Sequence, residues 1–83
     1  TKGVRLSAIF VVLSLLAQSD MELGMKALDA NKPAEAEVYF GKAAAADAKD
    51  YAAFFHLALA QSLQAKNDEA IANYDKVLAL KPK

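Results

Sequence analysis

The chain has 83 residues, with ten basic and ten acidic side chains, one histidine and no cysteine. This length suits a single domain with a small hydrophobic core, and the balanced charge provides no basic stripe of the kind that tracks the phosphates of nucleic acid. Without cysteine, the chain has neither a disulfide framework nor a thiolate metal site.

The first 17 residues are strongly apolar and differ from the rest of the chain. Lys2 and Arg5 are the only charged side chains before Asp20. The segment holds nine large apolar side chains, whose burial is worth on the order of 10–25 kcal/mol, against roughly 5–15 kcal/mol of net stability for a typical domain. We therefore expect residues 1–17 to form an apolar helix that is buried against a partner. Its main contact residues are Leu6, Ile9, Phe10, Val12, Leu13 and Leu16.

Three interpretations of this segment compete. It has the order of a secretory signal, with "LLA" before Gln18 as a cleavage site. As a membrane anchor, residues 4–17 give roughly 21 Å of helix for a hydrocarbon core of roughly 30 Å, which is short unless Lys2 and Arg5 snorkel to the interface. As a docking helix, it packs on protein. We expect the segment to be retained, with lipid or protein as its partner.

Four helices are predicted in the remaining residues, because apolar side chains recur at intervals of three and four. Ser19 and Glu22 form a capping box that opens the first, which runs to about Ala30. In the second, Pro33 takes the first helical position, and Glu35 and Glu37 lie in the first turn, near the positive end of the helix dipole. The third opens near Asp50. For the fourth, we expect Asn67 as the cap, Asp68 and Glu69 in the first turn, and Pro82 as the stop.

The sequence matches itself at a shift of 34 residues. Small residues fall on small ones and aromatic residues on aromatic ones in the pairs Leu23 and Leu57, Gly24 and Ala58, Ala36 and Ala70, Phe40 and Tyr74, and Ala43 and Val77. We expect Gly24, Ala36, Ala58 and Ala70 to lie where helices cross, because short side chains let helix axes approach closely. The space around these crossings is expected to be filled by Leu23, Phe40, Leu57, Tyr74 and Leu78.

This pattern resembles the tetratricopeptide repeat over residues 17–83. Asp20, Ala48 and Gln61 depart from it, at positions where the family usually has an aromatic residue, proline and tyrosine. The resemblance implies an all-α fold, a short α-solenoid of two helical hairpins over residues 18–50 and 51–83, with the apolar helix of residues 1–17 before it. It also implies a groove lined by the first helix of each hairpin. The groove residues would be Met21, Met25, Leu28, Phe55, Leu59 and Leu63.

Catalysis is not expected. His56 has no cysteine or second histidine to pair with, and the three glycines are isolated, so we expect no catalytic residue, cofactor, metal or small-molecule substrate. A groove with two methionines suits an apolar helix, although its residues would also fit internal packing. We expect a self-assembling interaction module whose partner is another copy of the chain, forming an oligomer or filament. The alternative is a membrane-tethered adaptor that binds another protein. Either function predicts an exported or membrane-associated protein. A cytoplasmic location is left open.

Overall fold

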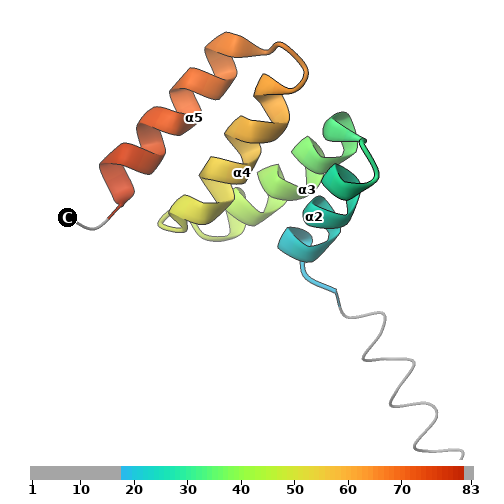
Figure 1. Ribbon diagram of the computed structural model, residues 1–83. Helices are drawn as coiled ribbons and strands as arrows, with labels where there is room; N and C mark the ends of the chain where they lie inside the picture. Colours follow the sequence, from blue (N-terminus) through green and yellow to red (C-terminus); the bar gives the residue numbers. More distant parts are fainter. Residues whose placement is uncertain (1–17, 82–83) are drawn as a thin grey trace, which may run out of the picture.

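The computed structural model describes residues 18–81, so the predictions for residues 1–17 and for Pro82 lie outside the described residues. This part of the chain consists of four α-helices and contains no strand, as predicted (Figure 1). The helices are α2 (Asp20–Asp29), α3 (Pro33–Ala46), α4 (Tyr51–Ser62) and α5 (Asn67–Leu80).

The predicted starts of the first three helices are confirmed. The Ser19 side chain accepts a hydrogen bond from the Glu22 backbone N–H at 3.1 Å, which caps α2. Pro33 is the first residue of α3. The Asp50 carboxylate accepts from the backbone N–H groups of Ala52 and Ala53, at 3.1 and 3.4 Å, and caps α4.

The prediction that Asn67 caps the last helix is wrong. Asn67 is already the first helical residue, Lys66 occupies the N-cap position, and no side chain caps α5. The reason lies in the preceding turn, where Ala65 has a left-handed φ of 60° and the Lys66 N–H donates to the Gln61 carbonyl at 2.9 Å. This Schellman-type ending of α4 leads directly into α5.

The turn between α2 and α3 has the same geometry. Asn31 also has a φ of 60°, and the Lys32 N–H donates to the Ala27 carbonyl at 2.8 Å. The bounds of α5 lie 34 positions after those of α3 at both ends. The sequence period is thus repeated in the backbone.

Each helix packs on the next one along the chain: α2 on α3, α3 on α4 and α4 on α5. The core is built largely from alanine, and Phe40 is its one large side chain that is fully buried among the described residues. All four small residues expected at crossings are buried: Gly24, Ala36, Ala58 and Ala70. A Cβ on Gly24 would come within 2.5 Å of the Phe40 ring, so the α2–α3 crossing requires glycine there.

Two further predictions about single residues are wrong. Leu78, expected in the core, is 75% exposed. Glu37, expected in the first turn of α3, lies beyond it, whereas Glu35 does lie in that turn.

Candidate protein-interaction surface

The six predicted groove residues come from α2 and from α4 with its C-cap residue, and they divide into two groups. Met25, Phe55 and Leu63 are exposed, at 41, 44 and 60%. Met21, Leu28 and Leu59 are half-buried, and the first two pack against the core. The predicted groove residues therefore serve internal packing in part and leave three apolar side chains open to a partner.

Phe55 is held in place by aromatic neighbours. Its ring meets the His56 ring edge-on, with centroids 5.5 Å apart, and the Tyr74 ring of α5 at 5.8 Å. His56 in turn lies 5.2 Å from the buried Phe40 ring. Such pairs are worth about 0.5–1.5 kcal/mol each beyond the area they bury. They present Phe55 to solvent in a defined orientation, at the junction of α4 and α5.

His56 is a half-buried helix residue. Its Nδ1 lies 2.8 Å from the Ala52 carbonyl oxygen, a contact in which Nδ1–H donates. The sequence had not associated His56 or Tyr74 with the groove. The periodicity pairs Tyr74 with Phe40 and so predicts it as a core residue, and no sequence signal places it beside Phe55.

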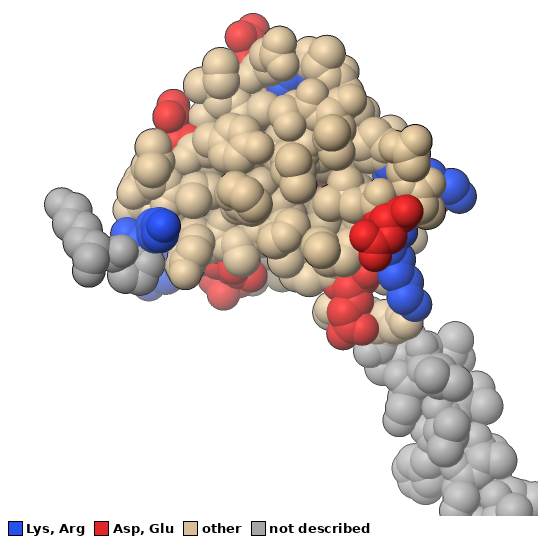
Figure 2. Space-filling model, in the orientation of Figure 1, with Lys and Arg blue, Asp and Glu red and all other residues tan. Residues whose placement is uncertain are grey.

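The face of the molecule that Figure 2 shows has an uncharged central area, and the Lys, Arg, Asp and Glu side chains visible there lie towards its edges. Between residues 18 and 81 there is also no group of three His, Cys, Asp or Glu side chains that could hold a metal ion. The exposed Met25, Phe55 and Leu63 can bury apolar area against a partner.

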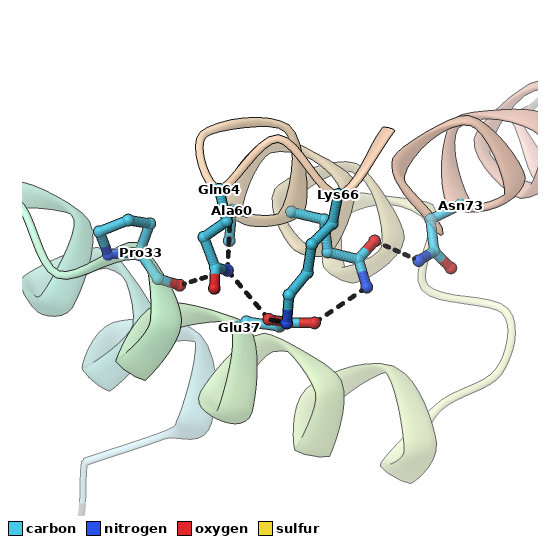
Figure 3. Close-up of polar contacts among 7 residues, drawn as sticks. Pro33, Glu37, Ala60, Gln64, Lys66 and Asn73 are labelled. Atoms are coloured by element: carbon cyan, nitrogen blue, oxygen red, sulfur yellow. Dashed lines mark hydrogen bonds and ion pairs between the residues drawn. The ribbon is translucent and has the colours of Figure 1, made fainter. Parts of the chain in front are cut away.

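A polar cluster joins α3, α4 and α5 (Figure 3). The Glu37 carboxylate of α3 accepts hydrogen bonds from the side chains of Gln61 at 3.2 Å, Gln64 at 2.9 Å and Lys66 at 2.9 Å. Gln61 is almost fully buried and also accepts from the Asn73 amide of α5 at 2.7 Å. One carboxylate thus ties α3 to α4 and, through Gln61, to α5.

The hydrogen bond from Lys66 is the main reason that the pKa of Glu37 lies below its ordinary value of 4.5. Desolvation opposes this shift, and the two glutamine amides reinforce it. The same contact raises the pKa of Lys66. In the described part of the chain, every buried side-chain nitrogen and oxygen has a hydrogen-bond partner, so the cluster is a completed structural link.

The comparisons with known proteins assign no family to this chain. No protein-family profile, curated protein or solved structure matches it. Within residues 18–81, no helix has the length and apolar character needed to cross a membrane. A function must therefore be inferred from the chain's own residues.

Proposed function

We propose that this protein is a non-enzymatic interaction module that self-assembles. In this proposal the four helices form two tetratricopeptide-like hairpins in a short solenoid. The apolar residues 4–17 of one copy pack on the groove or the open end of a neighbouring copy. The product is an oligomer or filament.

The observation that carries the proposal is the amount of apolar surface within one short chain. Among the described residues, large hydrophobic side chains that are exposed include Met25, Phe55, Leu63, Ile71 and Leu78. Residues 4–17 add nine more large apolar side chains and include one charge, Arg5. Each such side chain is worth about 1.5–3 kcal/mol when it is buried, so joining the two sets is strongly favourable.

The repeated backbone supports the hairpin interpretation. Helices α3 and α5 have the same length at a spacing of 34 residues, and matching left-handed turns precede them at Asn31 and Ala65. A repeat unit of this kind buries one face against its own hairpin and needs a neighbour for the other.

The chemistry of the surface suits binding. Removing thioether, aromatic and aliphatic groups from water lowers the free energy. These groups also do not transfer protons at neutral pH. Phe55 is oriented before a partner arrives, which lowers the entropy lost on binding.

A membrane-tethered adaptor is the second candidate, and it rests on the same residues 4–17. In that case lipid covers the segment, and the groove takes a different protein. The two candidates differ in what the protein does without lipid or detergent.

The test is the mass of the full chain in detergent-free buffer, measured by sedimentation and electron microscopy. We expect ordered oligomers. The variant Phe10→Asp with Leu13→Asp should give monomers of unchanged helicity, whereas the control Val38→Asp, at an exposed position of α3, should assemble like the original chain. Monomers that appear only in detergent or vesicles, with no ordered oligomer, would favour the adaptor and refute self-assembly.

A further inference from the structure

Helices α3 and α5 are equivalent, and one face of each can be compared residue by residue. The 34-residue shift places Ile71, Tyr74 and Leu78 of α5 at the positions of Glu37, Phe40 and Ala44 of α3. We call the first three residues the α5 outer face. Positions i, i+3 and i+7 lie along one side of a helix, so each set forms a continuous strip.

On α3 this strip is covered by α4. Phe40 is fully buried and packs with Ala60, Ala44 packs with Ala53 and Phe54, and Glu37 accepts from Gln61. The covering helix presents alanines together with Phe54 and Gln61 to the strip. The fold therefore uses this strip to receive a helix.

On α5 the same strip is open. Ile71 is 58% exposed, Leu78 is 75% exposed, and Tyr74 is half-buried where Phe40 is fully buried. The strip is also more apolar than its counterpart, because isoleucine and leucine replace glutamate and alanine. Among the described helices only α4 packs closely on α5, and its Phe55 contacts Tyr74 of the strip, whereas Ile71 and Leu78 remain exposed.

The α2 helix of a second copy is a poor occupant for this strip. At the positions of His56 and Ala60, which face α3 from α4, α2 carries Glu22 and Lys26. Stacking α2 on α5 would bury these two charges against Ile71 and Leu78, which is costly without partners.

Residues 4–17 fit the strip better. They are as long as α5, at 14 residues, and almost wholly apolar. The segment and the residues next to it carry two basic side chains, Lys2 and Arg5. On α5, the exposed Asp75 lies on the same side as Ile71 and Leu78, between them. Complementary charge would favour one placement of the segment along the strip.

The segment must come from another copy. In its own chain it is joined through Gln18 and Ser19 to α2, which lies at the opposite end of the row of helices from α5 (Figure 1). We propose that the α5 outer face is the docking site for residues 4–17 of a second copy. This inference rests on the proposed self-assembly and names its receiving surface. The contact is head-to-tail, so it closes into a ring or continues as a filament.

The decisive experiment places the photo-crosslinking residue benzoylphenylalanine at position 78 of the full chain. Assemblies are prepared from equal parts of isotopically light and heavy protein, so that mixed crosslinked peptides identify contacts between copies. We expect mixed crosslinks from position 78 to residues 4–17. The inference would be overturned if position 78 crosslinked to residues 4–17 of its own copy. Crosslinks to α2 or α4 of a second copy, or to lipid alone, would overturn it as well.

A matched pair of variants separates this inference from the proposed function. Leu78→Lys should weaken association at least about tenfold, because a charge then interrupts the apolar strip, while lysine suits the C-terminal end of a helix. Val38→Lys makes the same change at a similarly exposed site, 56%, on α3 and should leave association unchanged. Undiminished assembly of Leu78→Lys would refute the α5 site alone. A chain that never assembles would refute the site and self-assembly together.

Discussion

The two glycines of the described helices, Gly24 and Gly41, give the sharpest test of how α2 packs on α3. Gly24 faces Phe40, where a Cβ would lie 2.5–2.8 Å from three ring carbons, whereas a Cβ on Gly41 would meet nothing within 4 Å. Alanine at either site gains about 0.8–1.0 kcal/mol in helix propensity. At Gly24 the added methyl overpacks a fully buried ring, which costs about 1–3 kcal/mol. We expect Gly24→Ala to lower the free energy of unfolding by up to about 2 kcal/mol and Gly41→Ala to raise it by about 0.5–1 kcal/mol.

The assay is urea unfolding followed by circular dichroism at 222 nm. Several protein concentrations are needed, because assembly stabilises the folded chain by mass action. In a Phe40→Leu background the ring is gone, and Gly24→Ala should lose most of its destabilising effect. If Gly24→Ala stabilises the chain by as much as Gly41→Ala does, the close α2–α3 crossing is wrong.

Three further predictions concern the turns and the polar cluster. Ala65→Gly should raise the midpoint of urea unfolding, because Ala65 has a left-handed φ of 60° that costs a non-glycine residue about 1–2 kcal/mol. Asp50→Ala should lower the free energy of unfolding by about 0.5–2 kcal/mol, since α4 loses its cap; thermal unfolding measures this, and an unchanged midpoint would contradict the capping role. Because the folded pKa of Glu37 is lowered, its contribution to stability is present above its ordinary pKa of 4.5 and is lost as pH falls through the lower folded value. Glu37→Gln should therefore flatten the loss of stability below pH 4.5 relative to the original chain, while Glu35→Gln, at an exposed site, should not.

Local signals were sufficient to predict where most of the helices begin. Ser19 and Asp50 cap through side-chain bonds that span two or three residues, and Pro33 fixes its own φ. The small residues at the crossings were also predictable, because the 34-residue shift pairs them and alanine and glycine have few other reasons to recur at that spacing. These features depend on neighbours in sequence or on a repeat that is visible in the sequence.

Glu37 shows where such reasoning fails. Its position near the start of a helix has a sufficient local explanation in the helix dipole, so the sequence gives no cause to look further. Its partners, Gln61, Gln64 and Lys66, lie 24–29 residues away. The Asn67 prediction failed for a related reason: Ala65 takes the left-handed conformation after the end of α4, and the next residue, Lys66, is then the N-cap of α5. Alanine is an unusual residue for that conformation, and nothing in the local sequence marks it.

Leu78 and Tyr74 lead to a more general conclusion about the chain. Periodicity predicts which side of a helix is apolar, and it predicted both residues as core. It does not say whether the side chains that cover them belong to the same copy. Phe40 and Tyr74 hold equivalent positions, yet Phe40 is fully buried and Tyr74 is half-buried, because α4 follows α3 and none of the described helices follows α5. One chain thus contains both an apolar strip on α5 that the described helices leave open and an apolar segment, residues 4–17, whose exposure to water is unfavourable. Pairing the α5 outer face of one copy with residues 4–17 of another would remove both from water, and the position-78 crosslink tests that pairing directly.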